Sequence, residues 1–301
     1  MAPDPSADPI SDDAKIPGAA RLPPGLYITA TPIGNRGDIT RRALDVLAAC
    51  DRILCEDTRV TRKLLTMYGL SRPLIAYHDH NALSIRPKAL AWIAAGEAVA
   101  LVSDAGTPLV SDPGCKLAAE ARERGLFVTA LPGASAALTA LMVAGLPTDR
   151  FLFLGFLPPR SKARREELAP FSDLRATLVV YESPRRLPAL LADAAAVLPG
   201  RRACVCRELT KRFEETRTGT LAELAARYET EGPPKGEVVV VIGPPEAPPA
   251  PPTDAEIDAA LALALKGRSV KDAVVLVQQA TGLPRRRVYA RALALSRTGE
   301  P

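Results

Sequence analysis

The sequence predicts an α/β fold with two sheet-containing domains, the first sheet mostly parallel and the second mixed, followed by a small helical appendage. Three observations predict this fold. Short apolar runs alternate with amphipathic segments from residue 26 onwards, as in βα units around a parallel sheet. A proline-rich linker at 245–253 ends the alternation, and helix-like segments follow it. The 301 residues, 47% of them hydrophobic, are enough for two cores.

The first domain is expected at 26–136, where strand-like and helix-like segments alternate. The apolar runs expected to form strands are 26–32, 52–57, 74–78, 98–104 and 126–133. The segments with apolar residues at three- and four-residue spacing, expected to form helices, are 38–50, 58–69, 84–96 and 112–125. Asp112 and Pro113 are typical of the N-cap and first position of a helix, so the last helix is expected to begin there.

The second domain is expected at 137–244, entered through a small-residue helix at 133–147. Its expected strands are 150–158, 176–184, 202–209, 236–244 and, as an edge strand, 213–220. Its expected helices are 184–198 and 221–229. The appendage at 254–298 is expected to form three short helices resembling a helix-turn-helix. Residues 1–25, acidic and rich in proline, are expected to be a disordered extension.

Composition narrows the class of protein. No apolar run is long enough to span a bilayer, and the N-terminus lacks the features of a secretory signal. The five cysteines lack the spacing of zinc ligands and indicate reduced thiols. We therefore expect a cytoplasmic protein with no bound metal and no membrane association. The net charge of +5 is compatible with an anionic partner.

Several loops that follow expected strands are rich in glycine, proline and small residues. The clearest are 29–40, 101–114 and 131–136. Loops after parallel strands lie at the carboxyl edge of the sheet, where open α/β sheets bind ligands. Glycine and alanine leave the backbone accessible to such a ligand. The sequence therefore predicts a ligand site at this edge.

The same loops resemble those of a known family. The matching stretches are 27–40, 55–65, 101–114, 131–136, 151–158, 179–187, 207–215 and 235–243, which follow in consistent order across 26–244. They resemble the tetrapyrrole methylase superfamily of S-adenosylmethionine-dependent methyltransferases. Within it, they resemble the subfamily that 2′-O-methylates the ribose of a cytidine in 16S (small-subunit) rRNA.

The resemblance implies that S-adenosyl-L-methionine binds between the two domains. The family's cofactor contacts fall on Pro32, Ser103, Asp104, Ala105, Thr107, Ser135 and Leu157. The small residues Gly106, Gly133 and Ala134 would bring the backbone close to the same ligand. The resemblance also implies small-subunit rRNA within the 30S particle as the partner, and a homodimer.

A ribose hydroxyl needs its proton accepted as it attacks a methyl group. Carboxylates at strand ends are the candidates, namely Glu182, Glu56 and Asp57, and Glu182 is preferred as the catalytic residue. The alternative is that these carboxylates form ion pairs with Arg59 or Arg185.

Clustered cations predict contacts with RNA phosphates. The candidate RNA-binding residues are Arg160, Lys162, Arg164, Arg165, Arg185, Arg186, Lys211, Arg285, Arg286 and Arg287. The segment 158–168 is expected to precede a helix. Tyr181 and Tyr289 are the candidates for stacking on bases.

Three alternatives fit parts of the sequence. A tetrapyrrole (porphyrinoid precursor) methyltransferase of the same superfamily would also use a basic cleft, but it would not need the basic segment 158–168 or the appendage. A non-enzymatic helix-turn-helix protein that binds nucleic acid would act through the appendage. A dinucleotide-dependent oxidoreductase is disfavoured, because 29–40 lacks the G-x-G-x-x-G pattern.

Overall fold

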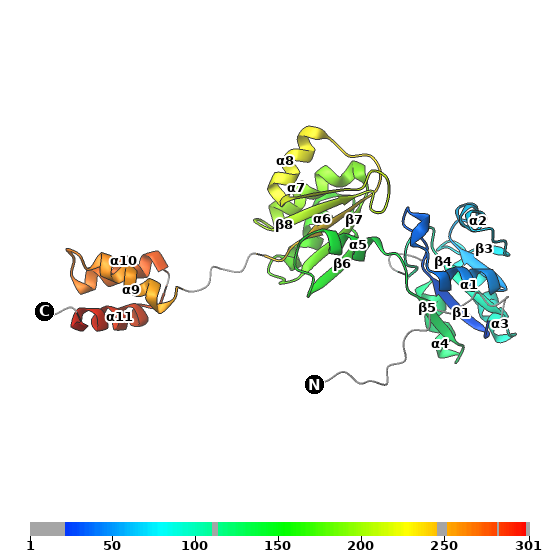
Figure 1. The fold of residues 1–301 in the computed structure, drawn as a ribbon, viewed down its shortest axis with the longest axis horizontal. Coiled ribbons are helices and arrows are strands. Elements are labelled where there is room, and N and C mark those ends of the chain that lie inside the picture. Colours follow the sequence, from blue (N-terminus) through cyan, green and yellow to red (C-terminus); the bar gives the residue numbers. More distant parts are fainter. Residues whose placement is uncertain (1–21, 110–113, 246–251, 282, 299–301) are drawn as a thin grey trace. The chain divides into compact units, whose positions relative to one another are not determined.

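The structure, a computed structural model, describes residues 22–109, 114–245, 252–281 and 283–298. It divides into two compact units, residues 1–245 and 246–301, and each is described by itself (Figure 1). The extension predicted at 1–25 lies outside the described residues except for its end. There Leu22 packs against the first core, and the hydroxyl of Tyr27 donates to the carbonyl of Pro23.

The first sheet is parallel, with strand order β3-β2-β4-β1-β5. Its strands are β1 (Gly25–Thr29), β2 (Arg52–Cys55), β3 (Leu74–Ala76), β4 (Ala98–Val102) and β5 (Val128–Leu131). The 3₁₀ helix η1 (Arg36–Asp38) follows β1, and the α-helices are α1 (Arg41–Ala49), α2 (Thr58–Met67), α3 (Ala82–Ala94) and α4 (Cys115–Glu123). The central strands β1 and β4 are buried along their whole length, because apolar clusters cover both faces of the sheet.

The second sheet is mixed, with strand order β6-β7-β10-β8-β9. Its strands are β6 (Phe151–Phe156), β7 (Thr177–Glu182), β8 (Arg202–Arg207), β9 (Glu215–Thr220) and β10 (Val238–Ile242). Strands β6 and β7 are parallel, and the other pairs are antiparallel. Strand β9 lies at the edge, as the sequence predicts. The α/β class with one parallel and one mixed sheet is therefore confirmed.

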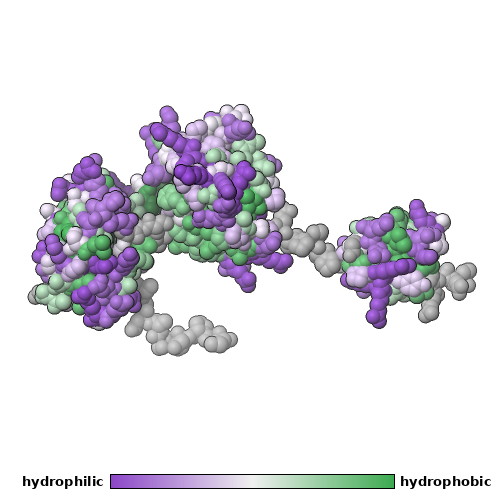
Figure 2. All heavy atoms as spheres, turned by 180° about the vertical axis from the view of Figure 1, so that it is seen from behind, coloured by the Kyte–Doolittle hydropathy of each residue, from purple (hydrophilic) through white to green (hydrophobic). Residues whose placement is uncertain are grey.

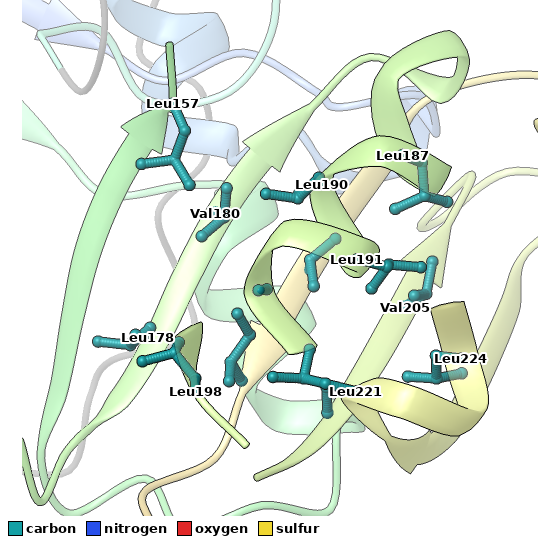
Figure 3. Close-up of a cluster of buried hydrophobic side chains, with 14 of the residues drawn as sticks. Leu157, Leu178, Val180, Leu187, Leu190, Leu191, Leu198, Val205, Leu221 and Leu224 are labelled. Carbon is teal, nitrogen blue, oxygen red and sulfur yellow. The ribbon is translucent and has the colours of Figure 1, made fainter. Parts of the chain in front are cut away.

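Helices cover both faces of the second sheet. One face carries α6 (Ser161–Leu168), η2 (Ala169–Phe171), η3 (Pro184–Arg186), α7 (Leu187–Val197) and α8 (Leu221–Glu231). Figure 3 shows Leu190 and Leu191 of α7 beside Val180 and Val205 of the sheet. The other face packs against α5 (Ala136–Val143). The chain thus passes from the first sheet to the second through α5, which begins at the carboxyl edge of the first.

Two expectations about helix starts are wrong. Helix α4 begins at Cys115 with Gly114 as its N-cap, two residues later than predicted. Asp112 and Pro113 lie outside the described residues. The basic segment 158–168 does not precede a helix; most of it is helix α6 itself. Its apolar positions are few, so apolar periodicity could not reveal this helix.

The described part of the appendage forms α9 (Asp254–Ala264), α10 (Val270–Thr281) and α11 (Arg285–Thr298) around a small core of its own. Thr253 and Glu256 form a capping box at the start of α9, which fixes that helix end. Within the described residues, no helix is both long and apolar enough to cross a membrane.

Candidate functional site

A pocket of about 220 Å³ lies between the carboxyl edge of the first sheet and the strand ends of the second. The first-domain residues that line it are Ile33, Ala105, Gly106, Thr107, Ser135 and Ala136. The second-domain residues that line it include Phe156, Tyr181, Glu182, Leu209, Glu237 and Val239. The edge of the first sheet, where the sequence predicts a ligand site, therefore forms one wall of a pocket, and the second domain forms the other.

The loop after β4 presents its backbone to this pocket. Gly106 exchanges two backbone hydrogen bonds with Thr31, of 2.9 and 3.0 Å. Its φ of +79° favours glycine, and a Cβ would lie 3.2 Å from Ile33 Cγ2. Behind the loop, the buried Ser103 hydroxyl lies 3.2 Å from the carbonyl oxygens of Ala105 and Gly106. These contacts hold the loop in one conformation with little side chain in the way of a ligand.

The turn between β5 and α5 is bonded to this loop. Thr107 donates through Oγ1 to the carbonyl of Ala134 at 3.0 Å. Gly133 packs so closely on β1 that a Cβ would lie 2.7 Å from the Cβ of Ala30. The first turn of α5 also reaches the second domain, because the amide of Ala137 donates to the Tyr181 hydroxyl at 3.1 Å. Tyr181 therefore holds the first turn of α5 against the second sheet, beside the pocket.

The cofactor residues expected from the sequence differ in where they lie relative to the pocket. Ala105, Gly106, Thr107 and Ser135 line the pocket, whereas Ser103, Gly133 and Ala134 support it from behind. Asp104 accepts a hydrogen bond from the Asp57 amide at 3.1 Å, so it ties the loop to the start of α2. Pro32 is next to the lining residue Ile33.

Leu157 is placed differently from the other expected cofactor residues. Its side chain is 1% exposed and belongs to the core of the second domain (Figure 3). Its carbonyl accepts a hydrogen bond from Arg186 at 2.6 Å. The Leu157 side chain therefore packs in this core and does not line the pocket.

The position of Glu182 argues against a role as proton acceptor. Its side chain lines the pocket wall but has no exposed surface, and its Oε2 lies 3.0 Å from Arg186 Nη2. Its Oε1 accepts from the Ser183 amide at 2.7 Å. The ion-pair alternative fits better, but with Arg186 rather than Arg185 as the partner. Among the lining residues, Glu237 is the carboxylate with an exposed side chain.

The other two carboxylates considered as bases, unlike Glu182, do not line the pocket. Asp57 caps α2 by accepting from the Arg59 amide at 2.8 Å. The side-chain hydrogen bonds from Arg59 lower the pKa of Asp57 to about 2. Glu56 is exposed and does not line the pocket. The ion-pair alternative is therefore correct for Asp57.

Residues 208–211 form a tight turn at the pocket wall. Glu208 and Thr210 have positive φ, +49° and +65°, and Leu209 between them lines the pocket. Lys211 Nζ lies 2.8 Å from Glu208 Oε1 and 2.6 Å from Glu237 Oε2. Burial alone would lower the pKa of Lys211, but these two carboxylates raise it, so the ammonium group stays charged. Lys211 is therefore engaged within the protein, which argues against its expected contact with RNA.

The turn also touches the first domain. The aliphatic part of Lys211 lies against Gly34, where a Cβ would collide with it.

Sequence reasoning missed Ile33, Leu209, Glu237 and Val239 as pocket residues. Leu209 and Val239 are ordinary apolar residues, and neither carries a glycine or proline signal.

The cations expected to bind RNA differ in whether they are exposed and whether a carboxylate already pairs with them. Arg160, Lys162, Arg185, Arg285 and Arg286 are exposed. Arg164 is 2% exposed and pairs with Asp193 at 2.6 Å, so its assignment to RNA binding is wrong: burial removes it from any RNA. Arg165 shares Asp193, Arg186 pairs with Glu182, and Arg287 pairs with Asp254.

Across the described ranges, no three His, Cys, Asp or Glu side chains come together in a group that could hold a metal ion. The pocket instead offers backbone groups, three hydroxyl-bearing side chains and an apolar wall. Such a lining suits an organic ligand with polar ends.

Family comparison classifies the fold. The family described as Tetrapyrrole (Corrin/Porphyrin) Methylases matches residues 25–225, and the RsmI C-terminal HTH domain matches residues 251–296. The unit with the two sheets is therefore a tetrapyrrole methylase unit. Diphthine synthase shares the fold at a TM-score of 0.57 and 15% identity, over 72% of this chain and 89% of that one. Uroporphyrin-III C-methyl transferase from Thermus thermophilus, complexed with S-adenyl homocysteine, shares it at a TM-score of 0.51 and 19% identity, over 72% and 96%.

Sequence relatives narrow the family further. Ribosomal RNA small subunit methyltransferase I of Mesorhizobium japonicum is 48% identical over 93% of this chain and 95% of its own length. That of Erythrobacter litoralis is 49% identical over 92% and 97%. The chain belongs to the family of ribosomal RNA small subunit methyltransferase I, as the matching stretches predict. This membership excludes the non-enzymatic and the oxidoreductase alternatives.

Proposed function

We propose that this methyltransferase transfers a methyl group from S-adenosyl-L-methionine to the ribose 2′-oxygen of a cytidine in small-subunit rRNA, within the 30S particle. The observation that carries the proposal is the pocket. The loop at Gly106, which has small side chains, forms one of its walls, and the strand ends of the second domain form the other. Family membership supplies the class of reaction and the rRNA substrate.

The residues present fit this cofactor, which supplies a methyl group on a positively charged sulfur. Ala105 and Gly106 leave space for the ligand against this loop, because alanine has a small side chain and glycine has none. The N-terminal end of α5, with Ser135, suits a carboxylate. Ile33 and Leu209 offer apolar surface to an adenine ring. Fixed positions are what a displacement at carbon requires, since it depends on alignment of the reacting groups.

Exposed cations support rRNA as the substrate. Arg160 lies just beyond β6, whose Phe156 lines the pocket, and Arg185 lies just beyond the lining residue Glu182. Lys162 is 89% exposed on α6. Cations on loops that leave the pocket walls would hold phosphates near the reacting ribose.

Mass spectrometry of 16S rRNA nucleosides tests the proposal. A deletion strain is expected to lose one 2′-O-methylcytidine, and the wild-type gene to restore it. The Gly106→Val gene should not restore it. A full complement of 2′-O-methylcytidine in the deletion strain would reject the substrate. Methylation of a free porphyrinoid by the purified enzyme would support the alternative substrate instead.

Lys211→Ala is expected to weaken binding of S-adenosylhomocysteine about tenfold, or ~1.4 kcal/mol. The reason is that Lys211 holds the strained turn carrying Leu209 and fills the space at Gly34. Lys211→Met, which keeps the aliphatic part, should lose less affinity. Calorimetry measures both. An unchanged ligand affinity together with weaker RNA binding would restore the RNA-binding assignment of Lys211.

We also propose that the protein is a homodimer. Hydrophobic residues reach the surface of the second domain (Figure 2). Exposed apolar side chains on α5 and the edge strand β6 are Leu138, Met142, Val143, Phe151 and Phe156. A face of this kind is typical of a contact between subunits. Met142→Glu, at a side chain 76% exposed, should give a monomer in sedimentation, whereas Leu83→Glu, at a 78% exposed site on α3, should not. A dimer that survives Met142→Glu would contradict this face.

A further inference from the structure

Five cations of the described appendage lie on two surfaces. On one, Arg287 Nη2 lies 2.9 Å from Asp254 Oδ1, and Arg291 pairs with both Asp254 and Asp258. These pairs hold α11 against α9. Hydrogen bonds and charge from Arg287 and Arg291 lower the pKa of Asp254, so the pairs persist at neutral pH. Arg287 and Arg291 therefore serve the packing of the appendage.

On the other surface, Lys271 of α10 and Arg285, Arg286 and Tyr289 of α11 line a shallow, open hollow. All four residues are exposed, and the Tyr289 side chain is 42% exposed. Within the described part of the chain, none of the three cations has a carboxylate partner. We call these four residues the cationic hollow.

The carboxylates of the appendage explain why the hollow keeps its charge. Residues 252–298 contain four acidic residues, Asp254, Glu256, Asp258 and Asp272. Asp254 and Asp258 bond to the arginines of the other surface. Glu256 bonds to Thr253 in the capping box, and Asp272 accepts from the Ser269 hydroxyl at 2.6 Å. Each carboxylate thus has a partner outside the hollow, and three like charges remain together around one aromatic ring.

We propose that the cationic hollow is the RNA-binding surface of the appendage, with phosphates held by Lys271, Arg285 and Arg286 and an unpaired base stacked on Tyr289. This rests on the proposed function, which makes rRNA the substrate. Adjacent cations fit consecutive phosphates, and an exposed ring beside them fits a base that is not in a helix. Arg287, which the sequence groups with its two neighbours, is not part of this surface.

The test is a salt titration of binding between the full-length protein and a single-stranded fragment of small-subunit rRNA. Arg285→Gln/Arg286→Gln should reduce the slope of log K against log salt by roughly 1–2, because each phosphate contact contributes about 0.7 on a single strand. The matched control is Lys266→Gln/Arg268→Gln, which removes two exposed charges in the α9–α10 turn, outside the hollow. Its slope should stay close to that of the wild type.

Variants of Tyr289 distinguish the contribution of base stacking to RNA binding from that of charge. Tyr289→Ala should weaken RNA binding about tenfold at unchanged salt slope, and Tyr289→Phe should bind like the wild type. Equal slopes for the two double variants would overturn the proposal. So would a hollow variant that loses binding to anionic phosphatidylglycerol vesicles but not to RNA. Binding of S-adenosylhomocysteine, measured in the same samples, should be unaffected. Its absence in the wild type would count against the proposed function rather than against the hollow.

Discussion

Gly106→Val is expected to weaken binding of S-adenosylhomocysteine by at least tenfold and to abolish methylation of small-subunit rRNA. The φ of Gly106, +79°, disfavours any side chain by roughly 1–2 kcal/mol. A Cβ there would also lie 3.2 Å from Ile33 Cγ2, and the valine methyl groups would extend further towards the pocket. The loop would have to shift, and the backbone groups offered to the ligand would shift with it. Calorimetry gives the affinity.

Gly125→Val is the matched control. Gly125 has a similar φ, +70°, at the end of α4, and no atom of the described residues lies within 4 Å of the position that a Cβ would take there. It should lose a similar amount of stability and keep the wild-type affinity for S-adenosylhomocysteine. If both variants lost affinity equally, backbone strain rather than pocket geometry would explain the result. If Gly106→Val bound normally, the loop would not be part of the site.

Asp193→Ala is expected to lower the free energy of unfolding by about 3–5 kcal/mol, because it leaves the buried Arg164 guanidinium without a carboxylate partner. Asp193 accepts from Ser161 at 2.8 Å and pairs with Arg164 and Arg165. Thermal and urea unfolding measure the loss. Glu166→Ala, in an exposed pair with Lys162, should cost no more than about 0.5 kcal/mol.

The ion pair between Asp193 and Arg164 also makes the stability of the fold depend on pH. Burial alone would raise the pKa of Asp193, but hydrogen bonds from Ser161, Arg165 and Arg164 outweigh it, so the pKa is lowered. A carboxyl group with a lowered folded pKa stabilises the fold above its ordinary value near 4, and this stabilisation is lost as the pH falls through the folded pKa. The acid branch of the stability profile should therefore flatten in Asp193→Ala. An unchanged acid branch would show that Asp193 does not carry this dependence. Arg164→Met/Asp193→Leu should recover most of the stability, which would rule out a general folding defect at α7.

Local chemistry made much of the fold predictable. Runs such as 98–104 could hardly be anything other than buried strands, and Gly96 and Gly125 have the positive φ that a helix end requires. The loop at Gly106 could be identified from the sequence because it is rich in glycine, proline and small residues. Arg164 was misread because its partner Asp193 lies 29 positions away. Whether an arginine is buried or exposed depends on whether a carboxylate pairs with it in the fold. The order of residues along the chain does not show which carboxylate that is.

The second wall of the pocket illustrates the same limit. Leu209 reaches the pocket because its two neighbours adopt positive φ without being glycine, and Lys211 stabilises that turn through carboxylates from two segments. Val239 lies on a strand that is apolar at every position from 238 to 242. Nothing local distinguishes the residue at a pocket from its neighbours in such a strand. The burial of Arg164 and the second wall of the pocket both depend on contacts between segments far apart in the chain.

The most direct measurement is a crystal structure of the full-length protein soaked with S-adenosylhomocysteine. The ligand is expected between the loop at Gly106 and Thr107 and the wall formed by Leu209 and Val239, with its polar groups within hydrogen-bond distance of the loop backbone. Ligand density elsewhere, with this pocket empty at a saturating concentration, would contradict the central claim that the two domains jointly form the cofactor site.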